Sequence, residues 1–207
     1  MKLLHIDSSI SGDGSATRQI SAAVTAALAR ANPGLQIVRR DLDADPIPHL
    51  DSRNLASVRP SPDLPPPLPA DVDANAAILE EFLDADVVVI GAPMYNFGVP
   101  SQLKAWLDRV LVPGQTFSYS EKGPVGLAGG KKVIIASARG GLYSAALPNA
   151  ANDFQETYLK AVFAFIGIDD VELVRAEGVA FGSEPRAAAL REALADAETV
   201  AGLAKAA

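Results

Sequence analysis

Five short apolar runs, separated by longer stretches with a helical pattern, restrict the fold of this chain more than any other feature. The first, third and fourth runs are continuous rather than alternating in polarity, which is typical of strands buried on both faces of a parallel sheet. The runs are Leu3–Ile6, Gln36–Arg39, Val87–Ile90, Val133–Ala136 and Val171–Val174. We therefore expect these five runs to be the strands of a parallel sheet.

The stretches between the runs have the signatures of helices. Ser15–Ala31 is rich in Ala, begins with Ser and Thr as cap candidates, and stops at Asn32-Pro33-Gly34. The other expected helices are Asp71–Asp84, Pro100–Leu111, Asp153–Ile166 and Pro185–Ala204. Regular alternation of strands and helices predicts an α/β fold with right-handed crossovers and helices on both faces of the sheet. The simplest order of five parallel strands is 2-1-3-4-5.

Two segments interrupt this alternation. Residues 42–70 form a long connection, and six of the fifteen prolines lie within residues 60–69, so the connection should run extended over a surface. In residues 112–130, glycines and prolines flank the short stretch 116–119, which predicts a small hairpin or an ordered flap. We find no internal repeat and no domain boundary, and we expect residues 1–207 to form a single domain.

Composition and charge exclude several classes of function. The chain has no Cys, which excludes disulfides, thiolate metal sites and a cysteine nucleophile. Its two His are far apart, so we expect no metal site, and we expect His5 and His49 to be structural or solvated. The formal net charge of −7 argues against nucleic acid or an anionic membrane as partner. No apolar run reaches about 18 residues, and the N-terminus resembles a strand rather than a signal peptide, so we expect a cytoplasmic protein.

The loop after the first strand, residues 7–18 (the hydroxyl loop), is rich in Ser, Thr and Gly and leads directly into a helix. A helix N-terminus offers free N–H groups that suit a phosphate, which Ser9, Ser15 and Thr17 would hold through hydroxyls and amides. Because the loop has no Lys, we expect Arg18 to contribute as well. The dinucleotide fingerprint and the nucleoside triphosphate loop are both missing, which favours a mononucleotide. The alternative is a helix cap and turn without a ligand.

The loop after the third strand, residues 91–100 (the aromatic loop), carries Met94, Tyr95 and Phe97. Their exposure is costly unless something flat covers them. Asn96 adds a donor and an acceptor for the edge of a heterocycle. The alternative is that the loop packs its aromatic side chains into the domain.

The loop after the fourth strand, residues 137–143 (the glycine loop), contains Gly140 and Gly141. Paired glycines let the backbone approach a ligand closely and direct N–H groups at it, although a plain turn explains them as well. The carboxyl ends of parallel strands meet at one edge of the sheet, so the three loops should converge. Together they suit a planar heterocycle with a phosphate tail, and riboflavin phosphate (FMN) is the obvious candidate.

Several short motifs spread over the chain match one known family. They are Ala92-Pro93-Met94-Tyr95-Asn96-Phe97, Pro100-Ser101-Gln102-Leu103-Lys104, Thr116-Phe117-Ser118-Tyr119, Gly129-Gly130-Lys131-Lys132, Arg139-Gly140-Gly141, Phe165-Ile166-Gly167-Ile168, and Asp41-Leu42 with Pro46-Ile47-Pro48. On these residues the chain resembles, over nearly its whole length, the FMN-dependent NADH-azoreductase family, also described as NADH:quinone oxidoreductases. The resemblance implies a flavodoxin-like fold, a homodimer, and one tightly bound FMN per subunit.

The same resemblance implies which residues bind FMN. The hydroxyl loop would hold the phosphate, the aromatic loop would line the isoalloxazine ring, and the glycine loop would meet the ring from another side. The implied residues are Ser9, Ser15, Ala16, Thr17, Met94, Tyr95, Asn96, Phe97, Ala138, Arg139, Gly140 and Gly141. Tyr119 matches an aromatic residue that the family directs toward the substrate pocket.

Three positions depart from the family's pattern. Ala138 stands where Ser is frequent, and Tyr143 stands where His is often found. Asp13 adds a negative charge to the hydroxyl loop and should therefore point to solvent.

The predicted activity is transfer of hydride from NADH or NADPH, through bound FMN, to small quinones or azo compounds. Two substrates that share one pocket would react in ping-pong order, and full cleavage of an azo bond to two amines would need two rounds. Backbone N–H groups near Asn96 and Gly140-Gly141 would stabilise negative charge on the ring. Either Arg59 or Arg139 is able to contact a phosphate of the donor, and neither distinguishes NADH from NADPH.

Two other functions are weighed against this one. A flavodoxin-like electron carrier would use the acidic surface to dock on a basic protein partner. A hydrolase with Ser9 or Ser15 as nucleophile would need a G-x-S-x-G elbow and a nearby His, and the sequence offers neither.

Overall fold

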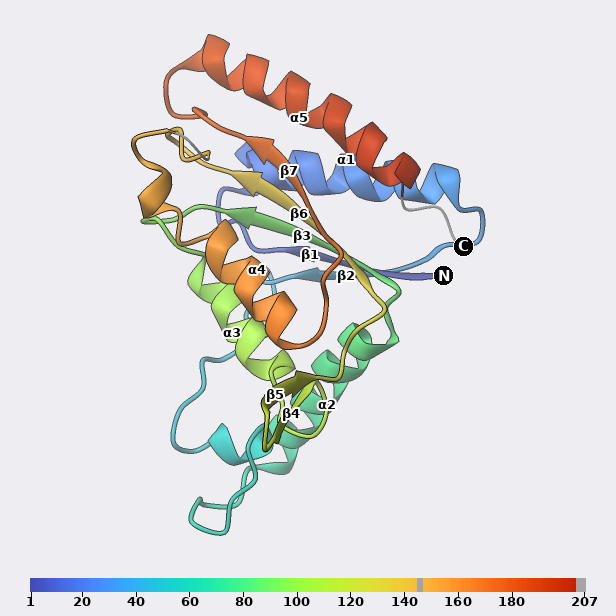
Figure 1. Ribbon diagram of the computed structural model, residues 1–207, viewed down its shortest axis with the longest axis vertical. Coiled ribbons are helices and arrows are strands. Elements are labelled where there is room, and N and C mark those ends of the chain that lie inside the picture. Colours follow the sequence, from blue (N-terminus) through green and yellow to red (C-terminus); the bar gives the residue numbers. More distant parts are fainter. Residues whose placement is uncertain (145–146, 204–207) are drawn as a thin grey trace.

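A parallel sheet lies between two layers of helices in the computed structural model (Figure 1), which describes residues 1–144 and 147–203. The sheet has five strands in the order β2-β1-β3-β6-β7, and each neighbouring pair is parallel. The strands are β1 (Lys2–Asp7), β2 (Gln36–Asp41), β3 (Val87–Pro93), β6 (Lys132–Ala138) and β7 (Val171–Ala176). Because β4 and β5 form a separate hairpin, this is the predicted order 2-1-3-4-5 in other numbers, and the prediction is confirmed.

The helices cover both faces of the sheet, as predicted. Figure 1 shows α1 and α5 on one face and α2, α3 and α4 on the other. They are α1 (Ala16–Ala31), α2 (Pro69–Asp84), α3 (Ser101–Val110), α4 (Glu156–Phe165) and α5 (Ser183–Leu203). The last residue of the helix predicted to end at Ala204 lies outside the described residues.

The molecule has two apolar cores, one on each face of the sheet, and the strand sequences explain both. Side chains alternate along a strand, so Leu4 and Ile6 of β1 face the core under α2, α3 and α4, whereas Leu3 faces the core under α1 and α5. All seven residues of β3 are buried, as expected for a central parallel strand. Each face of β3 thus has apolar residues to bury, which is why its sequence does not alternate in polarity.

The long connection predicted over residues 42–70 crosses the outside of the molecule, with one short 3-10 helix (η2, Leu55–Ser57) inside it, and it ends two residues earlier than predicted because α2 begins at Pro69. The buried side chain of Arg109 in α3 holds this connection: its Nη2 donates to the carbonyl of Pro48 at 2.8 Å, and its Nη1 donates to Asn75 Oδ1 of α2 at 2.9 Å. Burial lowers the pKa of Arg109. A single guanidinium therefore joins the connection to two helices.

Residues 112–130 contain the predicted hairpin, formed by β4 (Phe117–Ser120) and β5 (Gly123–Gly126). The hairpin packs closely on the turn after α4, since a Cβ at Gly126 would lie 2.1 Å from the amide nitrogen of Gly167. Ala128 also donates its amide to the carbonyl of Ile166 at 2.9 Å. These contacts place the hairpin at the end of α4 that lies far from the carboxyl ends of the strands (Figure 1).

The predicted helix Asp153–Ile166 begins three residues later in the structure. Another 3-10 helix, η3 (Ala150–Asn152), comes first, and Asp153 Oδ1 then accepts the amide of Glu156 at 2.9 Å. Asp153 therefore lies before α4 and binds the first amide of the helix instead of lying within it. No helix in residues 1–144 and 147–203 is long and apolar enough to cross a membrane.

Candidate functional site

The hydroxyl, aromatic and glycine loops meet at the carboxyl edge of the sheet, as the sequence predicts. The hydroxyl of Tyr95 in the aromatic loop lies 3.3 Å from Ser9 Oγ and accepts the amide of Ile10 at 3.3 Å. On its other side, the aromatic loop is joined to the glycine loop by the amide of Met94, which donates to the carbonyl of Ala138 at 2.8 Å. The three loops therefore form one continuous surface.

The hydroxyl loop ends in a helix start with free donors. Ser15 is the N-cap of α1, and its Oγ accepts the amide of Arg18 at 3.2 Å. The hydroxyls of Ser15 and Thr17 lie 3.1 Å apart, and both side chains are buried. The amides of Ala16 and Thr17 donate to no described residue. Two hydroxyls and two amides at the positive end of a helix can bind an anion.

The side chain of Arg18, which the sequence predicts to help hold the phosphate, is bound within the protein. Its guanidinium binds the carboxylate of Asp41 at 2.5 and 2.8 Å, and its Nε and Nη2 donate to the carbonyl of Ser9 at 3.2 and 2.8 Å. The hydrogen bond from Arg18 lowers the pKa of Asp41 to about 2, so the pair is ionic at neutral pH. Arg18 is thus engaged within the protein and holds the loop in place, because Asp41 at the end of β2 lies close enough to pair with it.

Asp13 is exposed, as expected, so its charge points to solvent. His5 is buried in β1 and His49 is exposed on the 42–70 connection, as expected of a structural and a solvated residue.

The aromatic loop is a tight turn with an unusual backbone. Tyr95 and Gly98 exchange two backbone hydrogen bonds of 3.0 Å, and the two residues between them have positive φ: 49° at Asn96 and 71° at Phe97. Positive φ is uncommon without glycine, and costliest for a bulky residue such as Phe97. The turn presents Asn96 and a Phe97 side chain that is 47% exposed. Strained backbone that persists at the edge of a sheet is a reason to look for function there.

In the glycine loop, the side chain of Arg139 points into the protein. It is fully buried and pairs with Asp153 at 3.0 Å, with Glu177 at 3.3 Å, and with Glu156. The sequence left open whether this guanidinium or that of Arg59 contacts a phosphate of the donor; in the structure three carboxylates on neighbouring elements bind the Arg139 guanidinium. Only the backbone of Arg139 is left for the site.

The backbone of the glycine loop offers free donors of its own. The amides of Gly140 and Gly141 donate to no described residue. Tyr143 stands beside them, with its ring on Gly141 and its centroid 6.2 Å from that of Phe97 in an edge-to-face arrangement. The glycine and aromatic loops thus border one space.

Tyr119 is not brought to these loops within one chain. It lies on β4, is 75% exposed, and packs edge-to-face on Phe117 with ring centroids 5.5 Å apart. Phe117 in turn contacts Phe165 at the last turn of α4, whereas the aromatic loop lies near the first turn of that helix. The ten residues of α4 span about 15 Å, so the helix separates the two positions.

Sequence reasoning did not single out Asp41 and Glu177 as residues that hold the site. Each stands at the end of a strand of the sheet: Asp41 is the last residue of β2, and Glu177 follows β7 directly. The position of Asp41 and Glu177 at strand ends was the one signal in the sequence. The arginines that they bind, Arg18 and Arg139, lie far from them along the chain.

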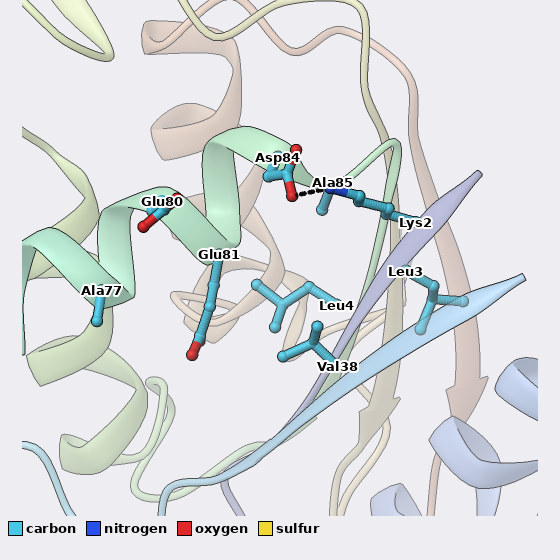
Figure 2. Close-up of a pocket in the computed structure, with 9 residues that line it drawn as sticks. All are labelled: Lys2, Leu3, Leu4, Val38, Ala77, Glu80, Glu81, Asp84 and Ala85. Carbon is cyan, nitrogen blue, oxygen red and sulfur yellow. Dashed lines mark hydrogen bonds and ion pairs between the residues drawn. The ribbon is translucent and has the colours of Figure 1, made fainter.

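Two hollows in the surface differ in their position relative to the three loops: one lies away from the carboxyl edge of the sheet and one lies beside it. One hollow has a volume of about 260 Å³. It lies near the start of β1, between β2 and the C-terminal half of α2 (Figure 2). Its Lys2 and Asp84 pair with each other, and its Glu81 pairs with Arg40, so its charged groups are largely satisfied. A second hollow, of about 490 Å³, is almost wholly apolar and adjoins the aromatic loop between α3 and α4. Its lining residues are Gly98, Val99, Lys104, Phe154, Thr157, Tyr158 and Ala161.

Comparison with known proteins identifies relatives over nearly the whole chain. The family model described as a flavodoxin-like fold matches residues 1–201. The FMN-dependent NADH:quinone oxidoreductase of Bradyrhizobium sp. (strain BTAi1) is 58% identical over 193 residues, which cover 93% of this chain and 96% of the relative. The protein of the same name from Methylocella silvestris is 54% identical over 194 residues, which cover 93% and 95% of the two chains.

Solved structures agree with this. A crystal structure of an FMN-dependent NADH-azoreductase from Bacillus anthracis in complex with FMN matches with a TM-score of 0.88, at 26% identity and 99% coverage of both chains. An azoreductase from the Sterne strain of the same organism matches with a TM-score of 0.86, at 26% identity and with 98% of this chain and 99% of that one covered.

Proposed function

This chain belongs to the flavodoxin-like family of FMN-dependent NADH:quinone oxidoreductases, and from that premise we propose that it binds one FMN per subunit and passes hydride from NADH or NADPH to quinones and azo compounds. The observation that carries the proposal is the junction of three loops at one sheet edge. Tyr95 bridges the hydroxyl loop to the aromatic loop, and Met94 bridges the aromatic loop to the glycine loop. Such a junction at the carboxyl edge is where open parallel sheets bind ligands.

The residues at this edge fit the phosphate of FMN. Ser9, Ser15 and Thr17 supply hydroxyls, Ala16 and Thr17 supply free amides, and α1 adds the positive end of its dipole. None of these donors needs to lose a proton to bind a phosphate dianion. Arg18 supports the group indirectly, because it holds the Ser9 carbonyl and so the shape of the loop.

The other two loops fit the flavin ring. Met94 to Phe97 would line one side of the ring, and Ala138 to Gly141 would meet it from another. The exposed Phe97 and the nearby Tyr143 offer flat apolar surface, and the free amides of Gly140 and Gly141 offer donors to the ring's oxygen and nitrogen atoms. When bound, FMN supplies the acceptor and donor of hydride. The protein would bind and orient the nicotinamide donor and the quinone or azo acceptor. Its backbone N–H groups would stabilise the negative charge on the reduced ring.

The two substrates would use one pocket in turn. Phe97 of the aromatic loop is an exposed apolar side chain at this edge, and NADH and a quinone or azo compound would compete for the same position beside it. We therefore expect ping-pong kinetics, with parallel lines in double-reciprocal plots. Cleavage of an azo bond to two amines then requires two rounds of hydride transfer.

We further propose that the active unit is a homodimer in which a second copy completes each site. Tyr119 is exposed on a hairpin that lies far from its own aromatic loop, and an apolar hollow adjoins that loop. A twofold pairing buries such surfaces on both copies at once. The hairpin of one subunit would then bring its Tyr119 to the site of the other.

A flavodoxin-like electron carrier is the alternative, and one experiment separates the two. The purified protein should be yellow, or become yellow when FMN is added, and should oxidise NADH steadily with a quinone as the only other reactant. If FMN binds but turnover requires an added protein partner, the chain is a carrier. A colourless protein that cannot be reconstituted with FMN would contradict both.

A further inference from the structure

Three consecutive carbonyls of the glycine loop are held from one side. The carbonyls of Arg139, Gly140 and Gly141 accept the amides of Val179, Ala180 and Gly178, at 3.2, 3.2 and 3.0 Å. These amides belong to residues 178–180, the loop between β7 and α5 (the backing loop). All three carbonyls of the glycine loop therefore point toward the backing loop.

The direction of the carbonyls decides the direction of the amides. In a trans peptide the N–H points opposite to the C=O of the same peptide unit, and the described residues include no cis peptide bond. The amides of Gly140, Gly141 and Leu142 therefore point away from the backing loop. None of the three donates to a described residue. Successive free N–H groups of this kind form a concave donor surface for negative charge.

Glu177 directly precedes the backing loop and ties both ends of the glycine loop. Its Oε1 accepts the amide of Tyr143 at 2.7 Å and lies 3.3 Å from Arg139 Nη1, and its Oε2 accepts the hydroxyl of Ser144. Burial alone would raise the pKa of Glu177. The hydrogen bonds from Ser144 and Tyr143 and the charge of Arg139 outweigh burial and lower the pKa, so the carboxylate is ionised at neutral pH.

Arg139, the partner of Glu177, is itself held by other side chains. Arg139 is fully buried and pairs with Asp153 and Glu156, and Glu156 is bound in turn by Arg175 at 2.9 Å. Gln155 links this cluster to the aromatic loop's strand, since its Nε2 donates to the carbonyl of Ala92 at 2.5 Å. A loop held at both ends in this way cannot turn its peptides without breaking buried ionic hydrogen bonds.

We infer that Glu177 is a positioning residue of the active site: it touches no ligand, and it holds the glycine loop so that the amides of Gly140, Gly141 and Leu142 point at the flavin ring. The inference rests on the proposed function, because it needs FMN at this edge. A ring that gains two electrons and one proton becomes anionic, so correctly directed amides bind that form more tightly than the oxidised form. Glu177 thereby raises the midpoint potential of bound FMN.

The sign of the potential change separates positioning from simple electrostatics. Glu177→Gln removes a negative charge near the site, which by charge alone would favour the anionic ring and raise the potential. Loss of positioning has the opposite effect. Glu177→Asp keeps the charge but shortens the side chain, so charge alone predicts no change, whereas positioning again predicts a lower potential.

The test measures the midpoint potential of bound FMN in wild type, Glu177→Gln and Glu177→Asp by spectroelectrochemistry. We expect both variants to bind oxidised FMN. The ratio of their affinities for reduced and oxidised FMN should fall about tenfold, which lowers the midpoint potential by about 30 mV for a two-electron couple. Glu184→Gln, at an exposed acidic residue in the first turn of α5, is the matched charge control and should leave the potential unchanged. A raised or unchanged potential in both Glu177 variants would overturn the inference.

A second measurement does not depend on the variants. FMN and riboflavin should both shift the amide NMR signals of Gly140, Gly141 and Leu142 in the wild-type chain, because the contact is to the ring. If FMN binds but leaves these signals in place, the inference fails while the proposed cofactor stands. If FMN does not bind at all, the proposed function itself fails.

Discussion

Asn96 and Phe97 are the residues whose own conformation is most unusual. Their positive φ angles, 49° and 71°, cost on the order of 1–3 kcal/mol each for residues other than glycine. The turn persists because Tyr95 and Gly98 close it with two hydrogen bonds, and because the amide of Phe154 donates to the carbonyl of Phe97 at 3.2 Å. The surrounding structure thus imposes a backbone that presents Asn96 and Phe97 outward.

A matched pair of substitutions separates the side chain of Asn96 from its backbone. Asn96→Gly removes the amide group without strain, and Asn96→Ala removes it and leaves an Ala in the left-handed region. Both should lower turnover per bound flavin more than FMN retention, since the phosphate end stays anchored. The Ala variant should also be less stable to urea than the Gly variant by about 1 kcal/mol. A Gly variant with wild-type turnover would mean that Asn96 serves the turn alone.

Ser15 and Thr17 should serve the phosphate rather than the ring. A hydrogen bond to a charged group contributes about 1.5–3 kcal/mol, so Ser15→Ala with Thr17→Ala should weaken FMN binding by about 3–6 kcal/mol, or less if amides compensate. Riboflavin, which lacks the phosphate, should bind the wild type and the double variant equally. Loss of the N-cap should also cost about 1 kcal/mol of stability.

Titration of both flavins into both proteins gives the result. Ser11→Ala, at an exposed hydroxyl of the same loop, is the control and should keep wild-type affinity. An equal loss for FMN and riboflavin would show that the two hydroxyls serve the fold.

At the scale of elements, the ion pair between Arg18 and Asp41 joins α1, the end of β2 and the hydroxyl loop. The pKa of Asp41 is lowered from 3.8 to about 2, so the pair stabilises the fold above about pH 4 and loses this contribution as the pH falls toward 2. Because both side chains are partly exposed, the contribution is on the order of 1 kcal/mol. Urea unfolding should show wild type more stable than Asp41→Asn at pH ~5.5, and the gap should close near pH ~2. A gap that stays constant with pH would contradict this role.

The docking of the β4–β5 hairpin depends on the absence of a side chain at one position. A Cβ at Gly126 would meet the backbone of Gly167 at 2.1 Å, and backbone cannot move aside as a flexible side chain does. Gly126→Ala should therefore lower the free energy of unfolding by about 1–3 kcal/mol or more. Gly14→Ala meets nothing within 4 Å and should leave stability nearly unchanged. Equal stability of the two variants would mean that the hairpin is not tightly packed.

At the scale of the whole molecule, one chain carries every part of the proposed cofactor site but leaves Tyr119 far from it. Sedimentation should show a dimer at micromolar concentration. Tyr119→Ala removes a ring that is 75% exposed and should leave the unfolding midpoint unchanged while it lowers turnover or changes the preference among quinones. A fully active monomer, or a Tyr119→Ala variant identical to wild type with every acceptor, would exclude a site completed by a second copy.

The sequence alone determined the strands, the helices and the edge of the sheet at which the three loops meet. Continuous apolar runs specified buried parallel strands, and helical periodicity with cap and stop residues specified the helices, because both signals are local. Ser15 as N-cap and the hairpin in residues 112–130 follow from such local chemistry. The meeting of the hydroxyl, aromatic and glycine loops also follows, since parallel strands end at a common edge.

Only the tertiary structure decided where the charged side chains point. Arg18 was expected at the FMN phosphate, and Arg139 was one of two candidates for a phosphate of the hydride donor. In the structure Arg18 pairs with Asp41, and Arg139 pairs with Asp153, Glu156 and Glu177. These partners lie 14 to 38 positions away along the chain, so no local pattern reveals them. The direction of the glycine-loop amides depends likewise on residues 178–180. A buried charge takes its partner from whatever the fold brings within reach, and that is a property of the packed molecule rather than of any stretch of its sequence.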